Sequence, residues 1–388
     1  MVYPILLTYF VLINPETGGL VCQAITEIAN SNTLQYAEKQ GFEPQIPFSM
    51  PVFKTGAFNR SATLPLTEAA QKNAPSRPET GDFIRVLSRR MKPIFQTGQW
   101  PAAMQAEVDL RIKTVREPNA DIEGILMRSA YKLDPTLIES LPNLRVIATC
   151  GVGVDGIPLE VCRARNIRVS NTPGVLNDAV CELTIGLLLS LLRRLPAADR
   201  FTRDGKWEQG LFPLTRSLAG KRIGIVGMGR IGQDLALRLI PFKVSISYTG
   251  PNRKGCPYDY FPSAQALAQA TDILILTCPG GKETDGLIDR SVLDAIGPNG
   301  FLINMSRGSV VNESDLIEAL SARTIAGAAL DVYADEPHVP QALRQLDNVV
   351  LSPHVGSATE ETRIAMTRLA VDNLLEFFKT GAMINPVA

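Results

Sequence analysis

Residues 221–239 of this 388-residue chain read KRIGIVGMGRIGQDLALRL, an apolar run that passes through a glycine-rich turn into an amphipathic run. The turn has the spacing GxGxxG, with Gly227, Gly229 and Gly232. A lone GxGxxG is weak evidence, but here a strand-like run precedes it, a helix-like run follows it, and another strand-like run begins within about twenty residues. We therefore predict a dinucleotide site at this turn.

Each glycine of the turn has a physical reason to be there. Gly227 permits a tight turn, Gly229 lets the backbone approach a pyrophosphate, and Gly232 allows the helix to pack closely on the strand. The N-terminus of the helix directs N–H groups and the positive end of its dipole at the anion. A glycine turn with a purely structural role is the alternative.

The sequence around this unit alternates between two kinds of run from about residue 122 onward. Short β-branched runs separated by helix-like runs are typical of parallel sheets with crossover helices. We expect strands at 123–127, 144–149, 222–226, 244–248, 272–277, 300–305, 325–332 and 348–351, and helices at 135–141, 158–165, 230–240, 263–270, 314–322 and 358–379. The prediction is an α/β fold of two linked units.

The segment after the glycine-rich unit indicates which dinucleotide is bound. NAD-binding folds usually place an acid on the adenosine ribose about twenty residues past the first glycine. Here residues 245–255 read SISYTGPNRKG, and no carboxylate occurs between Asp234 and Asp259. Without that acid a 2′-phosphate is not repelled, and Arg253 can bind it through charge-assisted hydrogen bonds, so we expect NADP to be preferred. A solvated basic turn is the alternative.

Three other strand-like runs end in residues suited to chemistry: INMSRGSVV contains Arg307, AALDVYADEPHVP contains Glu336, and LSPHVGSAT contains His354. The carboxyl ends of parallel strands line the ligand crevice. Arg307 would hold and polarise a 2-oxo acid, and His354 would donate a proton while Glu336 stabilises the imidazolium. Each residue alone is more often a solvated or capping residue. His338, in a proline-flanked turn, is expected on the surface.

Composition excludes several classes of partner. Lys plus Arg and Asp plus Glu number 39 each, so no basic field is present for nucleic acid or an anionic membrane. The apolar runs at 3–13 and 183–195 are too short to span a bilayer, and no secretory signal is evident. Six scattered cysteines without CxxC spacing predict reduced thiols and no metal site. The absence of targeting signals favours a cytoplasmic location.

These motifs resemble the D-isomer-specific 2-hydroxyacid dehydrogenase family. The resemblance begins near Met91 and is most specific from Cys150 to Thr359. The matching segments are GVGVDGIPLEVCRARNIRVSNTPGVLNDAVCELTIGLLL, GIVGMGRIG, NMSRGSVVNESDLIEAL, ALDVYADEP and LSPHVGSAT. The resemblance implies a reductase that acts on small 2-oxo acids with a nicotinamide cofactor.

The resemblance also implies roles for individual residues. Arg307, Glu336 and His354 correspond to the catalytic residues, and the backbone of Val152 and Gly153 to the loop that holds the substrate carboxylate. Further expected cofactor contacts are Thr184, Gly227, Gly229, Arg230, Ile231, Gly232, Thr249, Arg253, Lys254, Cys278, Pro279, Met305, Asp331 and Gly356. Among these, Asp331 matches the contact to the nicotinamide carboxamide.

The architecture that the resemblance implies is two Rossmann-like parallel-sheet domains, one inserted in the other. Residues 91–173 with 357–388 would form the substrate domain, and residues 174–356 the dinucleotide-binding domain. Residues 1–90, which match nothing in the family and are rich in Pro, Asn, Ser and Thr, are expected to be a disordered or weakly structured extension. The region near 112–135 is shorter than the family pattern, so the sequence does not define this wall of the substrate pocket or the substrate side chain that it accepts. The helix near Asn177 resembles the family's dimer arm and implies a homodimer.

Within the family, GKWEQGLFPLTRSLAGKRIGIVGMGRIG and SYTGPNRK are most similar to NADPH-preferring glyoxylate/hydroxypyruvate and hydroxyphenylpyruvate reductases, with NAD as a second possible cofactor. Hydroxyphenylpyruvate is thus an alternative substrate. A phosphoglycerate dehydrogenase would want extra basic residues and often a C-terminal regulatory domain, for which we expect no room after AMINPVA. A dinucleotide-sensing protein without turnover is the alternative from another class, and an activity assay separates the two.

Overall fold

The computed structural model describes residues 8–13, 20–25 and 93–387. Strands β1 (Thr8–Ile13) and β2 (Leu20–Ile25) pair antiparallel, a hairpin that the sequence pattern did not predict. They belong to a different compact unit from residues 76–388. The other residues of the expected extension at 1–90 lie outside the described residues, so that expectation stays a prediction.

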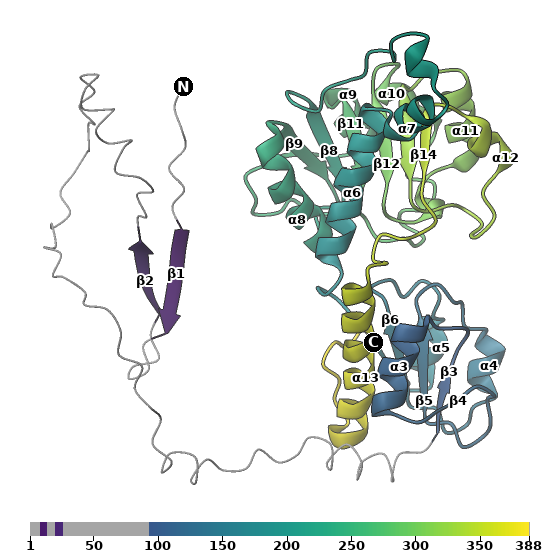
Figure 1. Cartoon of the computed structure of the whole chain (residues 1–388). Coiled ribbons are helices and arrows are strands. Elements are labelled where there is room, and N and C mark those ends of the chain that lie inside the picture. Colours follow the sequence, from purple (N-terminus) through teal and green to yellow (C-terminus); the bar gives the residue numbers. More distant parts are fainter. Residues whose placement is uncertain (1–7, 14–19, 26–92, 388) are drawn as a thin grey trace, which may run out of the picture. The chain divides into compact units, whose positions relative to one another are not determined.

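The first large sheet has five parallel strands in the order β4-β3-β5-β6-β7, of which Figure 1 labels β3 to β6. They are β3 (Ile94–Gln96), β4 (Thr114–Val115), β5 (Gly124–Arg128), β6 (Val146–Cys150) and β7 (Arg168–Ser170). Strands β5 and β6 are buried almost throughout, as apolar strands are when helices cover both faces of a parallel sheet.

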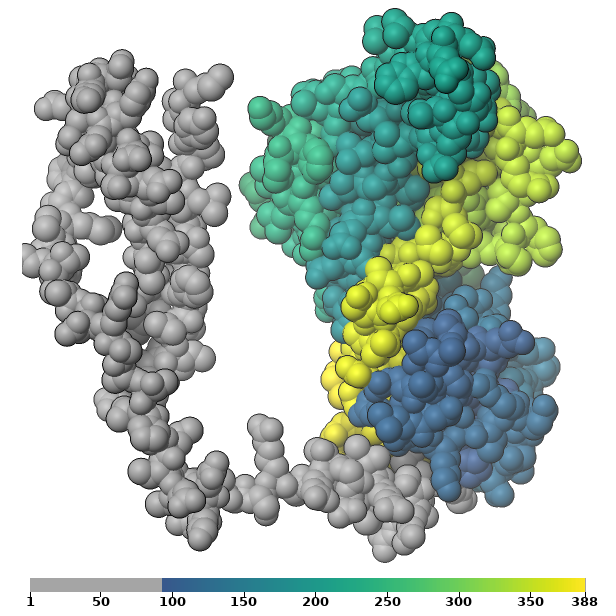
Figure 2. All heavy atoms as spheres, viewed as in Figure 1, coloured from purple at the N-terminus to yellow at the C-terminus, as the bar shows by residue number. Residues whose placement is uncertain are grey.

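Helices cover both faces of this sheet. One face packs on α3 (Ala102–Arg111) and α13 (Glu360–Thr380), and the other on α4 (Pro135–Glu139) and α5 (Leu159–Ala164). The last helix thus returns from the end of the chain to the first sheet, and its surface lies against that of the first sheet's residues in Figure 2. Its N-cap is Thr359, whose hydroxyl accepts a hydrogen bond from the Thr362 N–H at 3.2 Å.

The second large sheet has seven parallel strands in the order β10-β9-β8-β11-β12-β13-β14. They are β8 (Arg222–Val226), β9 (Ser245–Thr249), β10 (Asp259–Phe261), β11 (Ile273–Leu276), β12 (Phe301–Asn304), β13 (Gly327–Leu330) and β14 (Val349–Leu351). Strand order reverses between β8 and β11. Such a switch point is where open α/β sheets bind ligands, outside the carboxyl ends of the strands.

One face of the second sheet is covered by α6 (Asn177–Leu192) and α8 (Arg230–Leu239), and the other by α9 (Ala264–Ala270), α10 (Arg290–Ile296), α11 (Glu313–Ser321) and α12 (Gln341–Gln345). Helix α7 (Leu195–Arg203) follows α6 and buries none of its residues. Short 3₁₀ turns occur at η1 (Lys206–Glu208), η2 (Ile240–Phe242) and η3 (Gly308–Val310). Two parallel-sheet α/β units, each with its own core, confirm the predicted fold class.

No helix in the described ranges is both long and apolar enough to cross a membrane. The domain boundaries near 173 and 357 stay predictions.

Candidate active site

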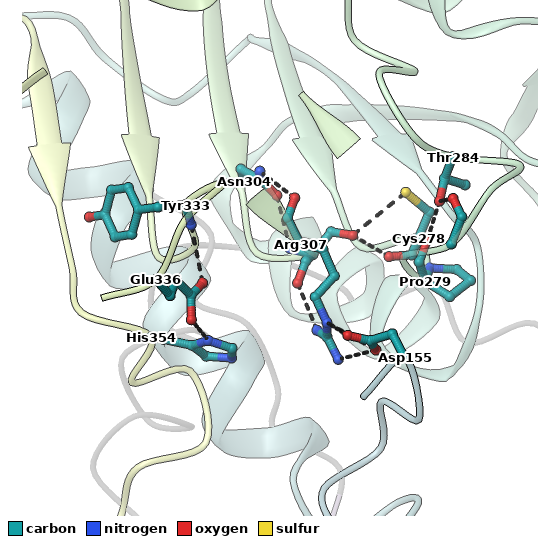
Figure 3. A network of polar contacts seen from close by, with 11 residues as sticks. Asp155, Cys278, Pro279, Thr284, Asn304, Arg307, Tyr333, Glu336 and His354 are labelled. Carbon is teal, nitrogen blue, oxygen red and sulfur yellow. Dashed lines mark hydrogen bonds and ion pairs between the residues drawn. The ribbon is translucent and has the colours of Figure 1, made fainter. Parts of the chain in front are cut away.

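A histidine and a glutamate lie in contact just beyond the carboxyl ends of β13 and β14. The Nδ1 atom of His354 is 2.6 Å from Oε2 of Glu336, and Oε1 of Glu336 accepts a hydrogen bond from the Tyr333 backbone N–H at 3.1 Å (Figure 3). The side chains of His354 and Glu336 are 40% and 31% exposed. The contact fixes the imidazole orientation and leaves Nε2 as the nitrogen that can meet a ligand.

The Glu336 carboxylate is held in its charged form. Burial opposes ionisation, but the hydrogen bond and positive charge of His354 more than offset that effect and lower the pKa of Glu336 below its ordinary value. A fixed negative charge therefore stands behind the ring and stabilises the imidazolium when it forms.

His354 sits on a loop that a buried aspartate organises. Its backbone is in the left-handed region, with φ of 53°, which costs a non-glycine residue roughly 1–3 kcal/mol. The Asp331 carboxylate accepts hydrogen bonds from the Ser352 hydroxyl at 2.7 Å, the Val355 N–H at 2.9 Å and the Gly356 N–H at 2.8 Å. These bonds on both sides of His354 hold the loop in this conformation. The expected contact of Asp331 with a nicotinamide stays a prediction.

Arg307 follows β12 and reaches across to the first sheet. Its Nε and Nη2 atoms lie 3.1 and 3.2 Å from the two oxygens of Asp155, a residue of the loop after β6 (Figure 3). Burial raises the pKa of Asp155, but the hydrogen bonds and charge of Arg307 outweigh it, so the net pKa is lowered. This ion pair connects the carboxyl ends of the two sheets.

The loop of Val152 and Gly153, expected to hold the substrate carboxylate, lies against the guanidinium of Arg307. A Cβ atom at Gly153 would come within 1.7 Å of Arg307 Nη2, and one at Gly280 within 2.7 Å of its Cγ, so a side chain at either position would displace Arg307 from where it lies. The Asn171 side chain fastens the loop by donating to the Val152 carbonyl at 2.8 Å. The structure thus brings Arg307, Val152 and Gly153 together, and the guanidinium and the loop backbone can face the same anion.

The glycine-rich turn has the geometry that its sequence predicts. Gly227 has φ of 102°, and a Cβ there would lie 2.5 Å from the Cys278 nitrogen. At Gly232 a Cβ would lie 2.3 Å from the Gly227 oxygen, so helix α8 packs tightly on the turn. Gly229, the N-cap of α8, has nothing within 4 Å of its Cβ position. The open side of the turn therefore faces away from the fold and has room for a phosphate at the helix N-terminus.

The loop after β9 presents the expected basic residues. Thr249 is buried at the end of the strand, whereas Arg253 and Lys254 are exposed. Tyr248 fixes the loop, because its hydroxyl accepts from the Lys254 N–H at 2.7 Å. Two exposed cations beside the turn fit a cofactor that carries an extra phosphate.

The other expected cofactor contacts differ in accessibility. Thr184 is fully buried in α6, where its hydroxyl donates to the Val180 carbonyl at 2.6 Å, and Cys278 is buried with its thiol 3.7 Å from the Ser306 hydroxyl. Arg230 and Pro279 are exposed, Ile231 and Met305 are half-buried, and Gly356 is buried beside Asp331. Their roles stay predictions. His338 lies on the surface, as expected, 3.6 Å from Asp335.

Sequence reasoning missed Asp155, Tyr333 and Ser352. Asp155 carried a usable signal, because it ends the GVGVD segment and follows a strand as the other candidates do. Tyr333 and Ser352 act through a backbone N–H and a hydroxyl, which no spacing rule distinguishes. No group of three metal-ligating side chains occurs within residues 93–387.

Comparison with known proteins gives consistent matches. The family model described as D-isomer specific 2-hydroxyacid dehydrogenase, NAD binding domain, matches residues 185–356. Glyoxylate/hydroxypyruvate reductase A of Arabidopsis thaliana is 46% identical and hydroxyphenylpyruvate reductase of Plectranthus scutellarioides 44% identical, each over 267 residues that cover 69% of this chain and 85% of the relative. An NADPH-dependent glyoxylate/hydroxypyruvate reductase from Sinorhizobium meliloti, solved with NADP and malonate, superposes with a TM-score of 0.73 at 42% identity and covers 77% of this chain and 97% of that one.

Proposed function

The chain belongs to the D-isomer-specific 2-hydroxyacid dehydrogenase family, and we propose that it reduces a small 2-oxo acid of the glyoxylate/hydroxypyruvate class to the D-2-hydroxy acid with NADPH. It is an oxidoreductase that acts on CH–OH donors and has an NAD-binding domain. The observation that carries the proposal is the pairing of His354 with Glu336 at 2.6 Å. This pair lies at the same carboxyl end of the second sheet as Arg307, whose guanidinium is in close contact with Gly153.

In the proposed mechanism, Arg307 and the N–H groups of the Val152–Gly153 loop hold the substrate carboxylate. The guanidinium also polarises the C2 carbonyl, because its positive charge stabilises the alkoxide that develops there. When bound, the nicotinamide supplies the hydride to C2. His354 donates a proton from Nε2 to the carbonyl oxygen, and Glu336 stabilises the imidazolium before this transfer. Glu336 also keeps the ring oriented throughout the cycle.

We assign the cofactor preference to the basic loop after β9. Arg253 and Lys254 are exposed there, and no acid lies between Asp234 and Asp259 to repel a 2′-phosphate. Thr249, at the strand end, would lie beside the ribose. The relative from Sinorhizobium meliloti that was solved with NADP supports this preference.

The test is an assay of NADPH and NADH oxidation with glyoxylate, hydroxypyruvate and 4-hydroxyphenylpyruvate. We expect faster oxidation of NADPH, with glyoxylate or hydroxypyruvate as the better substrate. Preference for 4-hydroxyphenylpyruvate would instead favour the activity in the name of the Plectranthus relative. Dinucleotide binding without turnover of any acid would contradict the proposal and favour a sensing role.

A further inference from the structure

Two arginines outside the candidate catalytic residues converge at the carboxyl end of the first sheet. Arg128 ends β5, and its ladder partner on β6 is Cys150. The Cys150 sulfur lies 3.9 Å from the Thr367 hydroxyl, which donates to the Arg363 carbonyl one turn earlier in α13. Side chains on a helix lean toward its N-terminus, so Arg363 projects past Cys150 toward the strand ends.

Neither guanidinium has a carboxylate partner in the described part of the chain. Arg128 donates from Nη1 to the Gln99 carbonyl at 3.1 Å and lies 5.8 Å from the centre of the Tyr131 ring, while its Nε is buried without a hydrogen-bond partner. The Arg363 guanidinium makes no hydrogen bond or ion pair with any residue of 93–387. A partly buried cation without a counter-charge is costly, and two together are more so.

The surrounding charges do not compensate for the pair. Burial and the positive charge of Arg128 both lower the pKa of Arg363. Burial raises the pKa of the Cys150 thiol to about 11, so it is neutral and offers no negative charge. Asp331 is near enough to influence Arg363, but its oxygens already accept three hydrogen bonds from the His354 loop. An added anion is the group that would satisfy both arginines.

The pair adjoins the loop proposed to hold the substrate. Cys150 is followed directly by Gly151, Val152 and Gly153. On the other side, Gln99 and Tyr131 fasten together the loops after β3 and β5, since the Gln99 N–H donates to the Tyr131 hydroxyl at 2.9 Å. The Arg128 side chain therefore packs against two loops that are hydrogen-bonded to each other, which holds its guanidinium in place.

We propose that Arg128 and Arg363 form a second anion-binding subsite, which takes a carboxylate or phosphate at the far end of the 2-oxo acid. This inference rests on the proposed function and adds 2-oxo acids with a second anionic group to its substrate class. Guanidinium groups suit this task because they stay charged and bind carboxylate and phosphate in bidentate fashion.

The test compares kcat/KM of the full chain for hydroxypyruvate, oxaloacetate and 3-phosphohydroxypyruvate, with Arg128→Gln, Arg363→Gln and the control Arg168→Gln, which removes an exposed arginine at the opposite end of the same sheet. For Arg128→Gln and Arg363→Gln, we expect kcat/KM to fall roughly 10- to 100-fold for the doubly anionic acids, as for a lost charged hydrogen bond. For hydroxypyruvate we expect kcat/KM to fall less than about threefold. Arg168→Gln should change neither. The dianion whose kcat/KM falls more in these variants identifies the group bound at the far end: a carboxylate if it is oxaloacetate, a phosphate if it is 3-phosphohydroxypyruvate.

Equal losses for all acids would overturn the subsite, as would hydroxypyruvate turnover without any use of the dianions, and both outcomes leave the proposed function standing. If no acid is reduced, the proposed function fails, and calorimetric binding of malonate and acetate then tests the subsite alone. Tighter binding of malonate that is lost in Arg128→Gln and Arg363→Gln supports it. Equal binding of malonate and acetate overturns it.

Discussion

At the scale of residues, the site consists of charged pairs. His354 is oriented by Glu336, and Arg307 by Asp155, so each cation that would meet the substrate has its own carboxylate behind it. The charge of His354 also lowers the pKa of Asp155, and that of Arg307 lowers the pKa of Glu336. The four groups therefore form one electrostatic unit, and a change at any of them affects the others.

Replacing His354 with Ala should lower kcat by about 10²- to 10⁴-fold, the usual range for a lost general acid. NADPH affinity should be nearly unchanged, because the glycine-rich turn that would bind the pyrophosphate lies on other strands. Steady-state kinetics and a fluorescence titration of NADPH measure the two quantities. A variant with unaltered kcat would remove His354 from the mechanism.

Replacing Asp155 with Asn should lower the free energy of unfolding at pH 7 by no more than about 1 kcal/mol, since the pair is partly exposed. The pKa of Asp155 is lower in the folded chain than in the unfolded chain, where it is about 3.9. The stabilisation is therefore present above that value and is lost as the pH falls through the lowered pKa.

Urea denaturation of the wild type and Asp155→Asn from pH 7 down to the lowest pH at which the wild type stays folded measures this difference. The exposed Asp259, at the start of β10, provides the control variant Asp259→Asn. A difference between wild type and Asp155→Asn that does not shrink at low pH would contradict the ion-pair account.

Replacing Arg253 with Ala should raise the Kd for NADPH much more than that for NADH, because only NADPH has a 2′-phosphate for the guanidinium to bind. Titrations with both cofactors, followed by nicotinamide fluorescence, give the two ratios. Similar losses for both would indicate a general defect of the loop after β9.

At the scale of elements, the strand–turn–helix unit was the most predictable part of the chain. Its strand was expected at 222–226 and is observed at Arg222–Val226, because β-branched residues, glycine spacing and an amphipathic helix all indicate the same structure. Strand β4 has two residues and β10 has three, too few for a period to register. Helix α7 has nine residues, carries a proline in its first turn and buries none of its side chains, so it was not among the expected helices.

Replacing two glycines of that unit with alanine should affect different properties, the stability of the fold at one position and the binding of NADPH at the other. Gly232→Ala should lower the free energy of unfolding by about 1–3 kcal/mol, because its Cβ would lie 2.3 Å from the Gly227 oxygen. Gly229→Ala should cost less than about 1 kcal/mol but weaken NADPH binding at least tenfold, because the methyl group enters the open side of the turn. Urea denaturation and NADPH titration of both variants provide the comparison, and equal effects on stability would refute it.

At the scale of the whole molecule, the site draws on loops from both sheets. Asp155 comes from the first sheet, while Arg307, Glu336 and His354 come from the second. Strand-end rules located the second set because its members follow strands of one predicted sheet. They did not show which loops of the two sheets meet, so the contact of Asp155 with Arg307 and the Arg128–Arg363 pair appeared only in three dimensions.

A second copy of the chain is the proposed partner at this scale. Leu195 is 49% exposed, Trp207 66%, Leu211 89% and Leu214 100%, all within one segment after α6. A cavity of about 440 Å³ adjoins the segment, and its lining is mixed, with Leu191, Leu214 and Phe301 beside Arg194, Arg216 and Asp347. So much apolar surface in one stretch is typical of an interface. The family resemblance implies a homodimer through the helix near Asn177, which directly precedes this segment.

Light scattering after size exclusion should therefore give twice the mass of one chain. The double variant Leu211→Glu with Leu214→Glu should give the mass of one chain, because burying two carboxylates in an apolar interface is unfavourable. Leu110→Glu, at a position 78% exposed on α3 of the other unit, should remain a dimer. A wild type of single-chain mass would refute the dimer. Dimers of the double variant would place the interface elsewhere, and the exposed leucines would then need another partner.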